Sequence, residues 1–179
     1  MQLKESLDDV GELERLDGRY FYAEYFGKTD PMGSDKPNPV SHVAYGYATQ
    51  VVILDEEGKI KKVVAAHDAG TVINPKSAEG QIEGGVVMGL GYGLTEDFPV
   101  DNGYPVLNYG RLGLMRATDV PEIEVKFVKS DKVSKLAYGA KGIGEICSVP
   151  TAPACQHAYY RYDGQFRTKL PLEHTKYKK

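Results

Sequence analysis

The chain has 179 residues, of which 41% are hydrophobic and 26% charged, and its net charge of −3 argues against a nucleic-acid-binding protein with its usual basic face. No stretch is long and apolar enough to span a membrane, and Met1 does not open a signal sequence, so we expect no membrane association. Two cysteines, Cys147 and Cys155, are too few for a disulfide framework and lack metal-site spacing, so we interpret them as packing thiols of a cytoplasmic protein.

The chain begins with a segment, residues 1–19, that is expected to be helical or irregular, because its leucines recur among charges up to a turn at Gly18. A domain over residues 20–172 is expected to follow, with a flexible tail over residues 173–179. Glycines and prolines recur between residues 27 and 40, which indicates a loop there.

A β-hairpin is predicted next. Residues 42–54 are rich in β-branched and aromatic side chains, a glycine-containing turn covers residues 55–58, and a return strand covers residues 60–66. His67 then precedes Asp68, a pair that could be catalytic or could bind a metal. Because no further residue with ligand spacing accompanies the pair, we favour a structural histidine with satisfied hydrogen bonds.

A helix is predicted from the Asn-Pro pair at residues 74–75 to about residue 96, with Asn as N-cap and Pro at the first helical position. Its many glycines are unusual, since each costs about 0.5–1 kcal/mol relative to Ala in a helix interior. Glycines four residues apart lie on one face, so we expect a sheet, another helix or a cofactor to approach that face closely. The pairs are Gly80 with Gly84 and Gly85 with Gly89.

The C-terminal half supplies one more strand and one more helix. Residues 122–128 begin with alternating charged and apolar side chains, which predicts a half-buried strand, and Pro150 or Pro153 should begin a final helix. We therefore expect an α+β fold, in which an antiparallel or mixed sheet is covered by helices near 75–96 and 150–161.

The loop Gly139-Ala-Lys-Gly-Ile-Gly-Glu145 is the most informative segment. Its glycines let the backbone approach a ligand, its N–H groups can form a concavity, and the Glu145 carboxylate would lie beside the ligand as a general base. A plain surface turn would explain an isolated pattern of this kind equally well. A dinucleotide-binding loop is disfavoured, because only 35 residues follow Gly144 and prolines interrupt any helix that starts there.

Four stretches in fixed order along residues 20–172 fit one family. They are Asn38-Pro39 with Val43-Ala-Tyr-Gly46, His67-Asp-Ala-Gly70 with Ile73-Asn-Pro75, Gly80-Gln-Ile-Glu-Gly-Gly85 with Met88-Gly-Leu-Gly91, and the loop Gly139–Glu145 with Pro150-Thr-Ala-Pro-Ala154. Each is a weak signal alone. Together they resemble the C-terminal part of the molybdenum-binding subunit of the xanthine dehydrogenase/aldehyde oxidoreductase family, the molybdenum hydroxylases.

The resemblance implies an oxidoreductase that hydroxylates a purine, another N-heterocycle or an aldehyde, with water as the oxygen source. Its molybdenum is held by the dithiolene of molybdopterin, so no metal-ligating side chains are expected. Glu145 matches the general base of the family. The cofactor-binding positions implied by the resemblance are Gly80, Gln81, Lys141, Gly142, Ile143 and Gly144.

Catalytic subunits of this family are several hundred residues long, so the resemblance implies a C-terminal fragment or a split subunit that is inactive alone and does not hold molybdopterin tightly. The implied partners are the missing N-terminal portion of the molybdenum subunit and the iron–sulfur and FAD subunits or domains. Two alternatives stay open at this point. One is a non-catalytic stand-alone domain without bound cofactor, and the other is a nucleotide-binding oxidoreductase.

Overall fold

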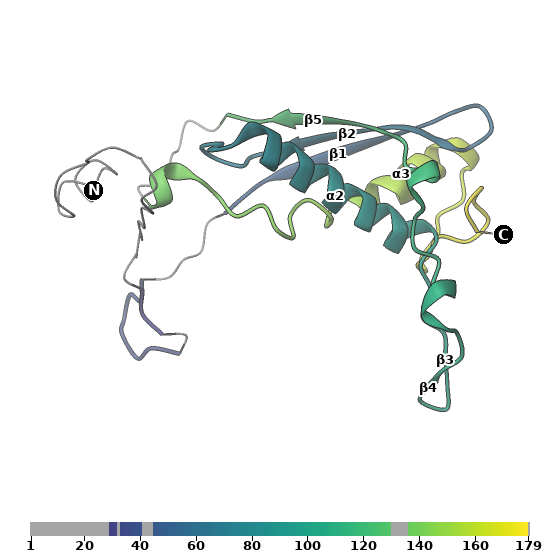
Figure 1. The fold of residues 1–179 in the computed structure, drawn as a ribbon, viewed down its shortest axis with the longest axis horizontal. Helices are drawn as coiled ribbons and strands as arrows, with labels where there is room; N and C mark the ends of the chain where they lie inside the picture. Colours follow the sequence, from purple (N-terminus) through teal and green to yellow (C-terminus); the bar gives the residue numbers. More distant parts are fainter. Residues whose placement is uncertain (1–28, 32, 41–44, 130–135, 179) are drawn as a thin grey trace, which may run out of the picture. The chain divides into compact units, whose positions relative to one another are not determined.

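A computed structural model describes residues 29–31, 33–40, 45–129 and 136–178 (Figure 1). The chain divides into two units between residues 42 and 43, and each is considered by itself. The described residues of the first unit contain no helix or strand, as predicted for that loop. The helix expected near the N-terminus and the predicted boundary between residues 19 and 20 lie outside the described residues.

The second unit is built on a three-stranded sheet in the order β1-β2-β5 (Figure 1). The strands are β1 (Ala48–Leu54), β2 (Ile60–His67) and β5 (Glu122–Phe127). β1 and β2 form an antiparallel hairpin, and β5 is parallel to β2. Parallel neighbours need a long crossover, which here contains helix α2 (Pro75–Leu94). The predicted hairpin and the predicted strand at residues 122–128 are confirmed.

The first strand of the hairpin is shorter than predicted. Residues 45–47 are described but belong to no strand, and residues 42–44 are not all described. The ladder begins at Ala48, which pairs with His67, the last residue of β2. Before that pair, the Tyr47 oxygen accepts one hydrogen bond from the Asp68 amide (2.8 Å), and the chain then turns away from the sheet.

The two long helices begin and end close to the predicted residues. The side chain of the N-cap Asn74 accepts a hydrogen bond from the Ser77 amide (3.1 Å), and α2 ends at Leu94. Helix α3 (Thr151–Asp163) ends at Gly164, whose φ of 74° is the left-handed conformation that commonly terminates helices. The predicted Asn74 cap of α2 is confirmed, whereas α3 has no side-chain cap at its start and is terminated by Gly164.

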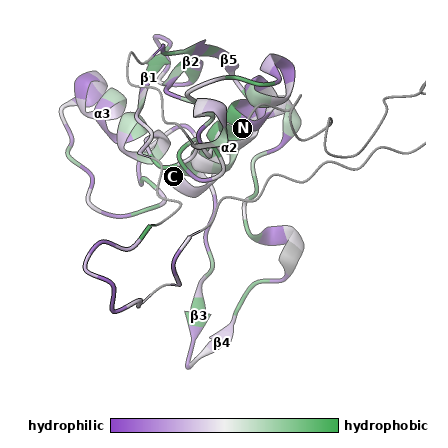
Figure 2. Ribbon diagram, turned by 90° about the vertical axis from the view of Figure 1, so that its left-hand side faces the viewer, coloured by the Kyte–Doolittle hydropathy of each residue, from purple (hydrophilic) through white to green (hydrophobic). Residues whose placement is uncertain are grey.

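Both helices lie on the same side of the sheet, with the three strands forming a separate layer (Figure 2). Val63 and Ala65 of β2 are buried toward the helices, whereas Lys62 lies on the opposite face and binds Glu122 and Glu124 of β5. This arrangement confirms the α+β class. The core consists of Val52, Ile60, Val63, Ala65, Ile82, Val86, Leu90, Leu94, Cys147, Cys155, Tyr159 and Leu172.

Short elements connect α2 with β5 and β5 with α3. Two of them, β3 and β4, form a small antiparallel ribbon that projects from the sheet and the helices (Figures 1 and 2). The short elements are β3 (Val100–Asp101), β4 (Tyr104–Pro105), η1 (Tyr109–Arg111), η2 (Ala117–Asp119) and η3 (Leu136–Gly139).

The C-terminal half of α2 packs against α3 through glycines. A Cβ atom on Gly85 would come within 2.3 Å of the Cys147 Cβ, and one on Gly89 would come within 2.5 Å of the Thr151 Cβ. Such distances leave no room for a side chain, so glycine allows the two backbones to approach. The predicted contact face is confirmed for the pair Gly85 and Gly89, and α3 with the turn before it is the partner.

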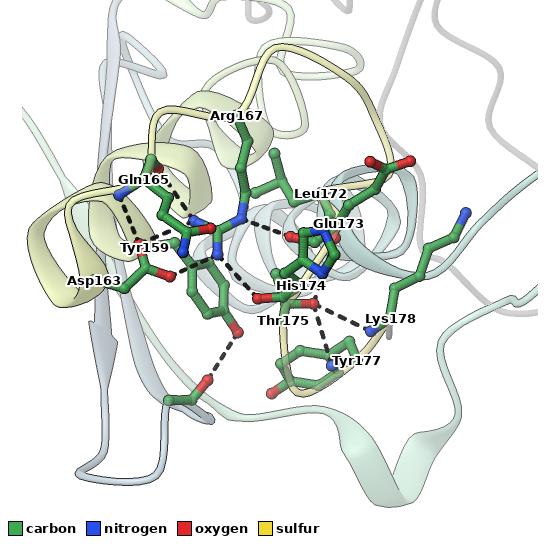
Figure 3. A network of polar contacts seen from close by, with 11 residues as sticks. Tyr159, Asp163, Gln165, Arg167, Leu172, Glu173, His174, Thr175, Tyr177 and Lys178 are labelled. Atoms are coloured by element: carbon green, nitrogen blue, oxygen red, sulfur yellow. Dashed lines mark hydrogen bonds and ion pairs between the residues drawn. The ribbon is translucent and has the colours of Figure 1, made fainter.

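The segment after α3 returns to the core and is held by Arg167 (Figure 3). Leu172 and Thr175 are buried there, so hydrophobic burial supports the polar contacts. The flexible tail over residues 173–179 stays a prediction. The contacts of Arg167 are an ion pair with Asp163 (2.6 Å), hydrogen bonds donated to the oxygens of Glu173 (2.6 Å) and His174 (2.9 Å), and the face of the Tyr159 ring (5.3 Å).

Candidate functional site

The turn after β2 and the glycine-rich loop, far apart in sequence, lie side by side. Gly70 explains how closely they approach: its φ is 62°, and a Cβ atom there would lie 2.1 Å from the Gly139 oxygen. Glycine is therefore required at this crossing. The backbone contacts are a β-bridge between Gly70 and Ala140, and hydrogen bonds from the Thr71 amide to the Gly139 oxygen (2.9 Å) and from the Lys141 amide to the Ala69 oxygen (3.1 Å).

A buried ion pair reinforces this junction. Lys141 Nζ lies 2.5 Å from Asp68 Oδ2, with the two side chains only 9% and 5% exposed. The other carboxylate oxygen of Asp68 accepts a hydrogen bond from the Gly70 amide (3.0 Å), and the Lys141 ammonium lies 6.0 Å from the centre of the Tyr47 ring. Hydrogen bonding from Lys141 holds the pKa of Asp68 below its ordinary value, so the carboxylate stays charged.

A hollow of about 310 Å³ opens between this junction and the start of α2. It brings together three of the predicted cofactor-binding residues, namely Gln81 from α2 and Lys141 and Ile143 from the loop. The helix begins at this wall, and a helix N-terminus favours negative charge. The remaining lining residues are Ala69, Thr71, Val72, Ile73, Asn74, Ser77, Ala78 and Ala140.

The other predicted site residues do not line this hollow. Glu145, the predicted general base, is exposed, and its carboxylate accepts no hydrogen bond from any residue that the structure describes. Its backbone is fixed, because the main-chain carbonyl oxygen of Glu145 accepts hydrogen bonds from the amides of Ser148 (3.0 Å) and Val149 (3.3 Å). The backbone of Glu145 is thus fixed, while its carboxylate oxygens remain available to accept a proton from an external group.

Two exposed glycines in the first half of α2 and two in the glycine-rich loop have open space beside them. For a Cβ atom added at any of them, no atom of the described residues lies within 4 Å. Packing inside the described chain therefore does not explain these glycines, and they leave room for a bulky group near Gln81 and along the loop. This open surface, with an amide side chain and a helix start beside it, fits one wall of a cofactor site. The glycines are Gly80, Gly84, Gly142 and Gly144.

His67 differs from its predicted state. Its side chain is completely buried on the core face of β2, as expected of a structural histidine, but neither ring nitrogen has a hydrogen-bond partner among the described residues. The prediction of satisfied hydrogen bonds was therefore wrong. Burial lowers the pKa of His67 and so favours the neutral ring.

Asp68 is the site residue whose role the sequence did not reveal. The sequence suggested a pair with its neighbour His67, but the carboxylate turns to Lys141, 73 positions later. A lone lysine inside a glycine-rich loop was the available signal. A lysine in such a loop needs a counter-charge if the loop packs against the domain.

The two cysteines are confirmed as buried, unpaired thiols. Burial raises the pKa of Cys155 to about 12, and Cys147 donates its S–H to the Ile143 oxygen (2.8 Å). Within the described ranges, no three His, Cys, Asp or Glu side chains gather in a way that could hold a metal ion. No described helix has the length and apolar character needed to cross a bilayer.

Two larger hollows lie away from the predicted site residues. One of about 630 Å³ is lined mainly by apolar groups such as Met88, Tyr92 and Leu114, and one of about 460 Å³ lies between β1 and α3. Neither contains any residue of the glycine-rich loop or the start of α2. Size alone therefore does not select the site; the convergence of three predicted residues does.

The sequence and fold have close parallels among known proteins. A family model described as "Molybdopterin cofactor-binding domain" matches residues 3–121, a range that contains Gln81 but ends before the glycine-rich loop. The chain is 31% identical over 144 residues to a probable xanthine dehydrogenase subunit of Bacillus subtilis (76% of this chain, 19% of that protein). It is 40% identical over 98 residues to the nicotine 6-hydroxylase large subunit of Paenarthrobacter nicotinovorans (52% and 12%).

Solved structures agree with this grouping. Quinoline 2-oxidoreductase from Pseudomonas putida 86 superimposes with a TM-score of 0.54 at 29% identity, over 63% of this chain and 15% of that one. A Cu,Mo-CO dehydrogenase superimposes with a TM-score of 0.57 at 26% identity, over 71% and 16%. The chain spans less than a fifth of the length of these relatives. Neither alternative that the sequence left open is favoured by these comparisons.

Proposed function

Since this chain belongs to the molybdopterin cofactor-binding domain family, we propose that it forms one wall of the cofactor site in a molybdenum hydroxylase that oxidises an N-heterocycle or an aldehyde. One observation carries the proposal. Gln81 from α2 and Lys141 and Ile143 from the loop line the same hollow, although 60 residues separate Gln81 from Lys141. These are positions that the resemblance assigned to cofactor binding.

The role of each residue toward the cofactor depends on which of its polar groups has no hydrogen bond within the described chain. The Gln81 side chain is exposed and can donate and accept hydrogen bonds at the hollow. The amides of Gly142 and Gly144 appear in no backbone hydrogen bond of the described residues, so they can donate to an acceptor on the cofactor. The ammonium of Lys141 is bound to Asp68, so Lys141 contributes its backbone and the stem of its side chain rather than its charge.

Glu145 acts as the general base in this proposal. When bound, the molybdopterin cofactor supplies the two-electron oxidation that hydroxylation with water requires. The carboxylate of Glu145 accepts a proton at one of its oxygens, while hydrogen bonds from the amides of Ser148 and Val149 to the main-chain oxygen of Glu145 fix the backbone from which the side chain extends. A positioned base of this kind contributes about 10²–10⁴-fold to a rate.

The substrate class rests on the relatives. Their names include xanthine, nicotine, isoquinoline and quinoline as well as aldehyde, so an electron-poor carbon of an N-heterocycle is the favoured target. Purine hydroxylation is the narrower form of the proposal. In this proposal the N-terminal portion of the molybdenum subunit completes the pocket, and iron–sulfur and FAD subunits or domains accept the electrons; the chain itself spans less than a fifth of its relatives. A cytoplasmic location stays a prediction.

The test is Glu145→Gln in the enzyme assembled with its complementary polypeptide and loaded with molybdopterin. We expect turnover of a heterocyclic substrate to fall at least 100-fold while the molybdenum content stays unchanged, because the amide cannot accept the proton. The matched control is Glu57→Gln, an exposed carboxylate in the turn at the other end of β2. Turnover of Glu145→Gln within tenfold of the control would reject the assigned role.

A further inference from the structure

We propose that Asp68 is a positioning residue for the glycine-rich loop: its buried ion pair with Lys141 clamps the segment Gly139–Glu145 onto the turn after β2. The proposal rests on the proposed function, because what the clamp positions is the cofactor wall and the base Glu145. Asp68 itself does not line the hollow, so its effect passes through Lys141.

Burial distinguishes this ion pair from the others. In every other ion pair between described residues, at least one side chain is 25% exposed or more, whereas here both are below a tenth. Exposed pairs are screened by water and hold their partners weakly. A buried charge that loses its counter-charge is strongly unfavourable, so neither side chain can leave while the other stays buried.

Glycine content makes such a restraint important at the start of the loop, whereas the Glu145 backbone at its end is held by the amides of Ser148 and Val149. Three of the seven loop residues are glycines, which have the largest backbone freedom to lose on ordering. Only the first part of the loop is hydrogen-bonded to the turn, through the Lys141 amide and the Gly139 oxygen. The ion pair acts at the same point, so the first three loop residues are fixed and Glu145 follows four residues later.

The ion pair also determines where the positive charge of Lys141 lies. Lys141 is the only cation in the loop, and its ammonium is committed to Asp68 and the Tyr47 ring. The Glu145 carboxylate accepts no hydrogen bond from the described residues. Asp68 therefore anchors the loop and holds its ammonium group at the turn after β2.

The experiment is amide hydrogen exchange in the complete 179-residue chain, read at the two amides that cross the junction, Thr71 and Lys141, relative to the amides of β2. In Asp68→Asn we expect exchange at both junction amides to accelerate at least tenfold more than in β2. Lys62→Met, which breaks the exposed ion pairs on the outer sheet face, is the matched control and should leave the junction unchanged.

A double variant, Asp68→Asn with Lys141→Met, covers the possibility that the single variant unfolds. It removes both charges, so exchange in β2 should return toward wild type while the junction amides stay at least tenfold faster. If the junction amides in either folded variant accelerate only as much as β2, Asp68 is merely structural and the proposal is overturned. Wild-type exchange at the junction overturns it as well.

The assembled enzyme separates this inference from the proposed function. We expect Asp68→Asn to lower both molybdenum content and turnover per bound molybdenum several-fold, whereas Glu145→Gln should lower turnover alone and leave junction exchange unchanged. If only the loss of turnover in Glu145→Gln is observed, the role of Asp68 is rejected and the proposed function is retained. If only the exchange result holds, the clamp is real and the proposed function falls.

Discussion

Glycine occurs in both halves of α2, but its surroundings differ between them. In the C-terminal half, Gly85 and Gly89 are buried, and α3 with its preceding turn occupies the space a side chain would need. In the N-terminal half, Gly80 and Gly84 are exposed, and no described atom lies close to them. The first pair is explained by packing inside the chain. The second pair is not, and substitutions there test whether a group outside the described residues approaches this half of the helix.

Buried polar side chains differ in how completely they are hydrogen-bonded, but they do not follow the division between the two halves of α2. Near the packed half, the Gln50 side chain donates to the Cys147 oxygen (2.8 Å) and accepts from the Thr151 hydroxyl (2.7 Å), so this network is satisfied. His67, at the end of β2 that leads to the open site, is buried without a partner among the described residues. Both amide atoms of Gln156 on α3 are likewise buried without a partner among the described residues, so unpaired polar groups occur near both halves of the helix.

The largest effect is expected for Gly85→Ala, which tests the packed half. The new methyl group would overlap Cys147, so α2 and α3 must separate, and we expect a loss of about 2–3 kcal/mol in the free energy of unfolding. Urea denaturation of the chain measures it. A loss below about 0.5 kcal/mol would mean that the two backbones are not held in close contact.

A smaller loss is expected for Thr151→Val, which keeps the shape but removes the hydroxyl donor. The buried Gln50 oxygen is then unpaired, at a cost of about 1–2 kcal/mol. The same denaturation measurement applies. Thr49→Val is the matched control, because Thr49 is exposed on β1 and should change stability little. Equal effects of the two substitutions would contradict the role given to the network.

A gain is expected for Gly84→Ala, which tests the open half. No described atom opposes the methyl group, so the better helix propensity should stabilise the chain by about 0.5–1 kcal/mol. Assembly with the complementary polypeptide and cofactor should become weaker, which titration of the two components measures. A variant that is more stable and assembles normally would show that nothing approaches this face.

The smallest effect at neutral pH is expected for His67→Leu. Because burial lowers the pKa of His67, the unfolded chain binds a proton that the folded chain does not, and wild-type stability should fall as the pH drops below about 6.5. The leucine variant should lose that part of the slope between about pH 7 and pH 5. Parallel stability curves for the two proteins over this range would show that His67 does not titrate as proposed.

Local features of the fold followed from short stretches of sequence. The Asn74 N-cap and both long helices were predicted to within a few residues, and the hairpin was found although its first strand is shorter than predicted, because turn residues, capping side chains and apolar periodicity act over a few positions. The composition of the glycine-rich loop marked it as a candidate site, whereas Gln81 was assigned only through the resemblance to the molybdenum hydroxylases. Local sequence could not tell that Gly80 and Gly84 face open space while Gly85 and Gly89 face α3, since all four carry the same local signal.

Sequence alone therefore determined the helices and strands of this protein and the residue types at its site, because both depend on residues that are close together along the chain. The tertiary structure decided which of them meet. It placed β5 beside β2, brought Lys141 to Asp68 across 73 positions and left His67 without a partner among the described residues. Contacts of this kind depend on how the chain crosses over the sheet and on which charges are removed from water together, and both are set only when the whole domain has folded.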